Sequence, residues 1–419
     1  MPILAESPRC ALAPPAPAGG MRYVARQPIL DLRGKLHGYE LLFRNGPENA
    51  FSGDSDLASR TMLDNTVMFG LGKLTSGLPA FVNCTADTLT GSLVHLLPSS
   101  MTVLEILETV EPSPAVIAAC RRLKASGYRL ALDDFDWKPG IERFVEMADY
   151  IKVDFLLTGA SERRKLLDLL SGVAVALIAE KVETEEQFLQ ARDEGFSLIQ
   201  GYYFCRPTLV ENHKVPANRL SHIEILRLLQ DDSIDLRELA QQVKRDASLT
   251  YRLLRLINSP MCAMRQEVRS VHAALMAVGE ETFRRLATLA ITSELNAGQP
   301  PELLRMAFVR GRFCELGSAH CGLNSNEQYL LGLLSLLPAM LHLPMRELAP
   351  SLPLREEIRR ALMGANIEGR SLLSWLERHE LGDWAACDAI VEDCVLQPDS
   401  LLQCYEEAVL WAEAALRFA

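Results

Sequence analysis

Short apolar runs alternate with helix-length segments through the first half of the chain. Eight of these runs have the length and composition of strands: RYVARQPIL, KLHGYELLFR, PAFVNCT, TVLEIL, YRLALDDF, YIKVD, VALIAEKV and LIQGYYF. The segments between several of them, such as SPAVIAACRRLKASG and TEEQFLQARDEG, have the apolar spacing of helices. Thr184, three residues before Gln187, is placed to cap the start of the second. Parallel strands joined by crossover helices produce this alternation, so the pattern predicts a TIM-like (β/α)8 barrel.

The pattern changes after Pro207, and the later apolar positions recur almost entirely at helical spacing, as in LRELAQQVKRDASLTYRLLRLI. We therefore expect an all-helical second domain, which the chain length of 419 residues also favours. The predicted organisation is a disordered Ala- and Pro-rich tail over 1–20, a barrel domain over 21–210, a linker over 211–218 and a helical domain over 219–419.

Most of the predicted strands of the barrel end in an acid or an amide. These residues are Glu40, Asn83, Glu105, Asp133, Asp134, Glu180 and Gln200. The YIKVD strand adds Lys152 and Asp154. The carboxyl ends of parallel barrel strands meet at one rim, where barrel enzymes place their chemistry. A rim rich in oxygen ligands predicts a site for a hard cation such as Mg²⁺ or Mn²⁺.

The charge, the cysteines and the hydropathy of the chain argue against several classes of protein. The formal net charge is −11, which argues against direct, non-specific binding of nucleic acid. The ten cysteines include no CxxC pair, and the first twenty residues lack the cationic start and apolar core of a signal peptide, so we expect free thiols in a cytoplasmic protein. The most apolar later stretch, YLLGLLSLLPAMLHLP, is broken by Pro338 and is too short to span a bilayer comfortably, so no membrane span is expected.

The polar strand ends resemble, in chain order, the motifs of the EAL domain, a barrel that hydrolyses the bacterial second messenger cyclic di-GMP. GYELLFR stands in place of the Glu-Ala-Leu signature, with Leu41 replacing the alanine. The further matches are FVNCT, LEILE, ALDDF, YIKVD, AEKVET and QGYYFCRP. Residues 219 to about 290, including RDASLTYRLLRLINSP, resemble the HDOD domain, a helical module related to HD phosphohydrolases. Together the two resemblances imply an EAL–HDOD protein of bacterial signalling.

The resemblance implies a two-metal Mg²⁺ or Mn²⁺ site and a role for each matching residue. The implied metal ligands are Glu40, Asn83, Glu105, Asp133 and Asp134, the last reaching a second ion. The implied catalytic residues are Lys152, which holds the attacking water, and Glu180, the general base. The implied substrate-binding residues are Arg44, at a phosphate, and Gln200, beside the metals. The implied supporting acids are Glu108 and Glu183. The reaction implied is hydrolysis of cyclic di-GMP to the linear dinucleotide pGpG.

The chain departs from the EAL pattern in places that keep a second interpretation open. Asp136 and Lys181 stand where the family has glycine, and the loop DWKPGIERF differs from the Gly- and Ser-rich loop of active members. The alternative is a catalytically inactive barrel that acts as a cyclic di-GMP receptor or as a protein-interaction scaffold. In both interpretations the HDOD domain docks an unidentified signalling protein. A homodimer also remains an open alternative.

The helical domain contains no His-Asp dipeptide, so it lacks the paired metal ligands of active HD enzymes. Its isolated histidines, among them His222 and His379, are expected to be packed or surface residues rather than ligands.

Overall fold

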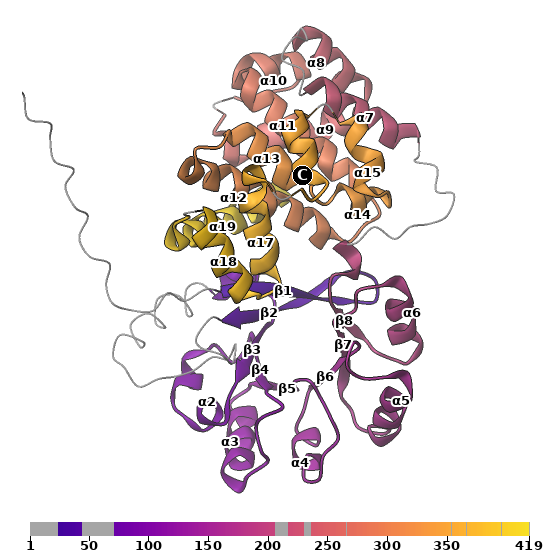
Figure 1. Cartoon of the computed structure of the whole chain (residues 1–419), viewed down its shortest axis with the longest axis vertical. Coiled ribbons are helices and arrows are strands. Elements are labelled where there is room, and N and C mark those ends of the chain that lie inside the picture. The colour runs from indigo at the N-terminus through magenta and orange to yellow at the C-terminus, as the bar shows by residue number, and fades with distance from the viewer. Residues whose placement is uncertain are drawn as a thin grey trace, which may run out of the picture.

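The computed structural model describes residues 24–43, 71–205, 217–229 and 236–418, apart from the single positions 265, 353, 366 and 395. The predicted tail over 1–20 and nearly all of the predicted linker lie outside these residues. The first part of the described chain forms a closed eight-stranded barrel, and the part after residue 216 is helical (Figure 1). The predicted fold classes are therefore confirmed.

The barrel strands follow one another around the barrel in chain order. They are β1 (Val24–Asp31), β2 (Leu36–Phe43), β3 (Ala80–Cys84), β4 (Thr102–Ile106), β5 (Arg129–Leu132), β6 (Tyr150–Asp154), β7 (Ala176–Glu180) and β8 (Leu198–Gln200).

The first strand differs from the prediction that all strands are parallel. Strands β2 to β8 pair in parallel, whereas β1 is antiparallel to both β2 and β8. The cause is the short connection after β1, in which the Asp31 carboxylate accepts hydrogen bonds from the amides of Arg33 and Lys35 and Gly34 has a φ of 75°. Such a tight turn can only join antiparallel neighbours, because a parallel connection needs a crossover segment.

Alternation along the strands divides the barrel interior into two layers. An apolar layer is formed by Ile29, Phe81, Val103, Ala131, Tyr150, Ile178 and Leu198. Two residues further along the parallel strands, the inward positions are polar, as in the pairs Phe81 and Asn83 or Ile178 and Glu180. Because side chains on one face of a strand recur every second residue, one short motif supplies both the core and the rim.

Helices surround the barrel and cover the outward faces of its strands. They are α2 (Ala86–Thr90), η1 (Leu93–Leu96), α3 (Pro114–Ala125), α4 (Glu142–Val145), α5 (Ala160–Leu169), α6 (Glu185–Asp193) and η2 (Tyr203–Cys205). The predicted start of α6 is confirmed, since the Thr184 hydroxyl accepts a 3.2 Å hydrogen bond from the amide of Gln187.

The remaining helices build the second domain. The first are α7 (Ala217–Leu229), α8 (Leu236–Arg245), α9 (Ala247–Ile257), η3 (Pro260–Cys262), α10 (Val271–Val278), α11 (Glu280–Leu295) and α12 (Pro301–Cys321). They are followed by α13 (Ser325–Leu334), α14 (Leu337–Leu341), α15 (Met345–Leu348), η4 (Ala349–Ser351), α16 (Glu356–Leu362) and η5 (Glu368–Arg370). The last are α17 (Ser371–Glu380), α18 (Trp384–Cys394) and α19 (Pro398–Leu416). Among the described residues, no helix is both long and apolar enough to cross a membrane.

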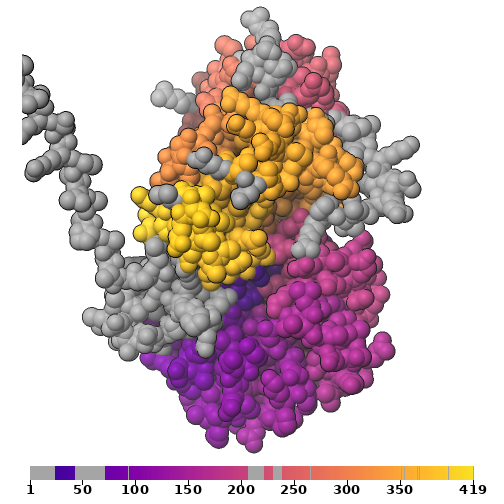
Figure 2. All heavy atoms as spheres, viewed as in Figure 1, coloured from indigo at the N-terminus to yellow at the C-terminus, as the bar shows by residue number. Residues whose placement is uncertain are grey.

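The C-terminal helices of the second domain lie against the first strands of the barrel (Figure 2). The Tyr39 hydroxyl on β2 donates to the carboxylate of Glu302 on α12, at 3.0 Å to each oxygen. The Glu380 carbonyl at the end of α17 accepts hydrogen bonds from Tyr202 (2.6 Å) and Gln27 (3.3 Å). The helical domain therefore contacts the barrel beside β1 and β2, close to where Glu40 points inward.

Candidate functional site

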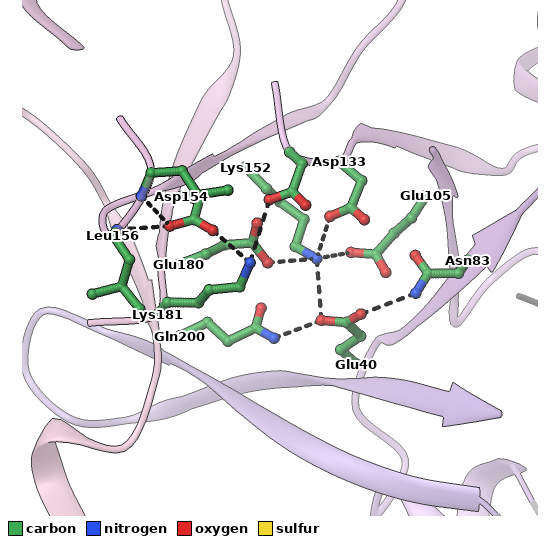
Figure 3. Close-up of polar contacts among 12 residues, drawn as sticks. Glu40, Asn83, Glu105, Asp133, Lys152, Asp154, Leu156, Glu180, Lys181 and Gln200 are labelled. Carbon is green, nitrogen blue, oxygen red and sulfur yellow. Dashed lines mark hydrogen bonds and ion pairs between the residues drawn. The ribbon is translucent and has the colours of Figure 1, made fainter. Parts of the chain in front are cut away.

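A single buried lysine lies at the centre of the polar rim. The Nζ atom of Lys152 lies 2.8 Å from carboxylate oxygens of Glu105, Asp133 and Glu180 and 3.1 Å from Glu40 (Figure 3). The residue is fully buried, and so is Glu105. Four strands that are far apart in sequence thus bring one acid each to the ammonium group on β6.

Two side-chain amides, from Asn83 and Gln200, donate hydrogen bonds to the Glu40 carboxylate. Asn83 Nδ2 donates to Glu40 Oε1 at 3.1 Å, and Gln200 Nε2 donates to Glu40 Oε2 at 2.5 Å. The parallel register aligns Asn83 with Glu105 and Asp154 with Glu180 across neighbouring strands. The rim residues that lie on strands are therefore brought together by strand register, whereas Asp133 and Asp134 follow the end of β5.

The cluster contains more carboxyl groups than one lysine neutralises. Burial raises the pKa of Glu105 well above its ordinary value, and the neighbouring Glu40 raises it further. Burial likewise raises the pKa of Glu180 to about 8, against the opposing effect of Lys152. Glu40 differs, because Lys152 and the hydrogen bonds from Gln200 and Asn83 outweigh burial and lower its pKa. The site as a whole would be stabilised by additional positive charge.

The donor set fits a divalent hard cation. Buried oxygens of Asn83 (Oδ1), Glu105 (Oε2), Asp134 (Oδ1) and Gln200 (Oε1) receive no hydrogen bond within the described part of the chain. Carboxylate and amide oxygens are the ligands that Mg²⁺ and Mn²⁺ prefer. In the described ranges, however, no three acidic, histidine or cysteine side chains surround a shared point as a metal cage would. The acids converge on the Lys152 ammonium instead, so a bound cation would compete with Lys152 for them.

A second cation lies at the edge of this cluster. Lys181, directly after Glu180, places its Nζ atom 2.5 Å from Asp154 Oδ2 and 3.8 Å from Asp134 Oδ1. Both Lys181 and Asp134 have positive φ angles, 53° and 40°. The sequence identified Lys181 as a departure from the EAL pattern, but it did not reveal the contact with Asp154, which depends on the pairing of β6 with β7.

The remaining predicted residues lie away from Lys152 or outside the described chain. Glu108 is exposed in the loop after β4 and lines a small cavity with Asp133 and Asp134. Glu183 is half-buried between β7 and α6, where its amide donates to Gln187. Neither carboxylate is among the acids that contact Lys152. Arg44 lies outside the described residues.

One residue at the site escaped the sequence analysis. The Gln27 Oε1 atom on β1 accepts a 3.1 Å hydrogen bond from Gln200, while Gln27 Nε2 donates to the Glu380 carbonyl of the helical domain. The alternation of Gln27 with the inward-facing Ile29 was the available signal. If β1 ran parallel to its neighbours, its C-terminal end would lie at the rim. Because β1 is antiparallel, the part of the strand that contains Gln27 lies at the rim instead.

Comparison with known proteins identifies two domains in the chain. The family model of the EAL domain matches residues 82–207, and that of the HDOD domain matches residues 216–355. The chain is 31% identical over 400 residues to the uncharacterised protein YuxH of Bacillus subtilis, covering 93% of this chain and 97% of YuxH. The chain belongs to the EAL–HDOD family. The EAL match begins after Glu40, so the assignment of Glu40 rests on its motif and its position at the rim.

One further relative and one solved structure are similar to this EAL–HDOD protein. Cyclic di-GMP phosphodiesterase CdgJ of Vibrio cholerae is 31% identical over 398 residues, covering 93% of this chain and 92% of CdgJ. The solved structure of Bacillus subtilis YkuI, an EAL-domain protein in complex with cyclic di-GMP and calcium, is 17% identical. That comparison covers 54% of this chain and 72% of YkuI, with a TM-score of 0.36.

Proposed function

We propose that this protein acts in cyclic di-GMP signalling and that its barrel hydrolyses cyclic di-GMP to the linear dinucleotide in a reaction that depends on Mg²⁺ or Mn²⁺. The observation that carries the proposal is the convergence of Glu40, Glu105, Asp133 and Glu180 on one buried lysine at the barrel rim. A structural ion pair needs one acid for one lysine. Four acids around one lysine, with orphaned oxygens beside them, suit a site that handles phosphate through bound cations.

The side chains divide into two groups in this proposal. The acceptor oxygens of Glu40, Asn83, Glu105 and Asp133 would hold a first metal ion, and Asp134 would face a second positive charge. When bound, the metal would neutralise phosphate oxygens and acidify a water molecule. Lys152 would orient that water through its ammonium hydrogens, and Glu180 would accept the proton.

The pKa of Glu180 fits this division of roles. A group with a pKa of about 8 is largely protonated at pH 7, and a protonated carboxyl cannot accept a proton. Added positive charge beside Glu180 favours its ionised form and so lowers its pKa. The base would therefore become active when the cation binds, which couples the two halves of the site.

The substrate side of the proposal rests on fewer described residues. We propose that Gln200 contacts substrate; in support, Gln200 lies beside Glu40 and its buried side-chain oxygen receives no hydrogen bond within the described chain. Arg44 is proposed to bind a phosphate. Glu108 and Glu183 are proposed to support the neighbouring loops, because Glu108 lines a cavity with Asp133 and Glu183 lies in the turn after β7.

Turnover by the purified protein tests the proposal. Cyclic di-GMP is incubated with Mn²⁺, and the linear dinucleotide is quantified by chromatography for the wild type, Glu40→Ala and Glu180→Gln. We expect product from the wild type and a drop of about 100-fold or more in each variant. Glu162→Gln, an exposed acid on α5, is the matched control and is expected to retain the wild-type rate. Equal product from the wild type and Glu180→Gln would exclude Glu180 as the base.

A second candidate function is a receptor that binds cyclic di-GMP without hydrolysing it. The observation that favours it is Lys181, whose ammonium group lies between Asp134 and Asp154. A titration of cyclic di-GMP into the same protein separates the candidates, since a receptor shows saturable binding and releases intact nucleotide. In both cases the helical domain is proposed to pass the signal to a partner protein.

A further inference from the structure

Lys181 is held in a backbone conformation that side chains seldom adopt. Among the described residues, five other than glycine have positive φ, and two of the five, Asp134 and Lys181, lie at this rim. A residue with a β-carbon is strained there, whereas glycine is not. The Lys181 side chain is 49% exposed, and its ammonium group contacts Asp154 and faces Asp134.

The acid that holds Lys181 is itself fixed in place. Asp154 is buried, and its Oδ1 atom accepts hydrogen bonds from the amides of Leu156 (2.6 Å) and Leu157 (2.9 Å). Its other oxygen, Oδ2, takes the 2.5 Å hydrogen bond from Lys181 (Figure 3). Both oxygens of Asp154 are therefore used, and the lysine ammonium is tied to a rigid carboxylate.

The same ammonium group faces the acid next to the main cluster. Asp134 follows Asp133, and its Oδ1 atom lies 3.8 Å from Lys181 Nζ, too far for a hydrogen bond. That oxygen is buried and receives no hydrogen bond from the described residues. Asp134 and Asp154 both line a cavity of about 600 Å³ that opens beside the rim. A positive charge is thus supplied by the chain at a point where two acids would otherwise face each other.

We propose that Lys181 is a built-in cation that takes the place of a second divalent ion beside Asp134, so that the barrel binds one divalent ion per chain. This inference rests on the proposed function for the first ion, at Glu40, Asn83, Glu105 and Asp133. It assigns the second positive charge of a two-cation site to a lysine side chain. Because the ammonium and an ion repel each other and share the oxygens of Asp134 and Asp154, both cannot occupy this point.

The number of Mn²⁺ ions bound per chain tests the inference without any activity measurement. Isothermal titration, checked by the electron paramagnetic resonance signal of free Mn²⁺, is applied to the wild type, Lys181→Gly and Lys181→Gln. The glycine variant removes the ammonium group and the strain, whereas the glutamine variant removes only the charge. Lys165→Gln is the matched control, because Lys165 lines the same cavity from α5. Ala263→Gly relieves a positive φ in the helical domain without changing charge.

We expect one Mn²⁺ in the wild type and in both controls, and two in Lys181→Gly. Lys181→Gln is expected to gain the second ion more weakly. A stoichiometry in Lys181→Gly that equals that of the wild type, whatever its value, overturns the inference. A second ion in the wild type overturns it as well. The first ion is tested separately with Glu40→Ala. If Glu40→Ala retains that ion, the proposed function is contradicted. The comparison of Lys181→Gly with the wild type still tests the inference about the second ion.

Discussion

At the scale of single residues, Lys152 determines the state of the rim. Four acidic side chains surround its ammonium group, and they raise the pKa of the lysine well above the ordinary value although burial opposes them. The acids in turn depend on the lysine, since its removal leaves several buried carboxyl groups without a counter-charge. The buried acids therefore require nearby positive charge, which a metal ion can also supply.

Replacing Lys152 with methionine should destabilise the protein by about 3–5 kcal/mol in the presence of a chelator. The loss should be larger at pH 8 than at pH 5.5, because Glu105 and Glu180 can take up protons at the lower pH. Added Mn²⁺ should restore part of the stability by binding the folded state. Thermal unfolding in EDTA and in Mn²⁺ measures both effects.

Lys124→Met is the control for this prediction. Lys124 pairs with Asp149 at 2.8 Å, but both side chains are about one-third exposed. An exposed pair contributes about 1 kcal/mol or less. A similar loss in the two variants would contradict the central role assigned to Lys152.

A second residue makes a separate prediction about acid stability. His379 is fully buried and stacks with Trp375 at 4.8 Å between ring centroids, and burial lowers its pKa to about 3. The structure thus confirms that this histidine is packed in the core. The unfolded chain binds a proton near pH 6.5 and the folded chain does not, so stability falls as the pH drops below about 6.5.

We expect His379→Phe to remove this component of acid sensitivity. At pH 5, about 1.5 pH units below the pKa of an unfolded histidine, His379 should lower the free energy of unfolding by about 2 kcal/mol, at about 1.4 kcal/mol per pH unit. Urea unfolding of both proteins between pH 5 and pH 7.5 gives the slope of the unfolding free energy against pH for each protein. His95→Asn, at an exposed histidine of the barrel, should keep the wild-type slope. Parallel curves for wild type and His379→Phe would rule out this explanation.

At the scale of elements, strand alternation explains why the acids that end the strands come together at the rim. In TVLEI and ALIAE the acid follows an inward-facing apolar residue by two positions, so both residues point into the barrel. The sequence predicted that Glu105 and Glu180 lie at the rim because they end strands, and alternation explains why both point inward. Lys181 and Asp134 could not be placed in this way, because their contacts depend on unusual backbone angles after the strands end.

The direction of β1 marks the other limit of prediction at this scale. Its composition is typical of a strand, and composition carries no information on direction. The tight turn at Gly34 decides the direction, and with it the position of Gln27 beside Gln200. Reading the short turn as a hairpin would have placed Gln27 at the rim.

The contact between α12 and α13 supports the helical domain through a close approach of two backbones. A β-carbon added at Gly332 on α13 would lie 2.2 Å from the Arg310 carbonyl oxygen on α12. Alanine at 332 gains about 1 kcal/mol of helix propensity, but the helices must separate, and we expect a net loss of about 2 kcal/mol. Chemical denaturation measures this net change in the free energy of unfolding. Gly369→Ala, with its nearest neighbour 4.0 Å away, should change stability by less than about 0.5 kcal/mol.

At the scale of the whole molecule, hydrogen bonds connect the rim to the helical domain. Gln200 Nε2 contacts both Glu40 and Gln27, and Gln27 donates to the Glu380 carbonyl. The Glu380 carboxylate is held by Arg310, which is also buried, at 2.6 Å between Nη2 and Oε2. A disturbance of α17 is therefore placed to reach the residues around Glu40.

Arg310→Met should show the importance of this connection. Loss of the guanidinium leaves the buried Glu380 carboxylate unpaired, and we expect a destabilisation of about 3–5 kcal/mol. Hydrogen exchange should rise in α17 and also in β1, which Gln27 links to it. Arg269→Met, which breaks an exposed pair with Glu267, should have neither effect. Exchange confined to the helical domain in Arg310→Met would show that the two parts are not coupled through Gln27.

A single-turnover experiment shows whether the barrel rim hydrolyses cyclic di-GMP. Protein in excess is mixed with cyclic di-GMP and Mn²⁺, and all nucleotide is recovered after denaturation, so that slow product release cannot hide the chemical step. We expect the bound nucleotide to be recovered as the linear dinucleotide with Mn²⁺, and as intact cyclic di-GMP with EDTA or in Glu180→Gln. Recovery of intact cyclic di-GMP from wild-type protein that has bound it in Mn²⁺ would instead identify the barrel as a receptor.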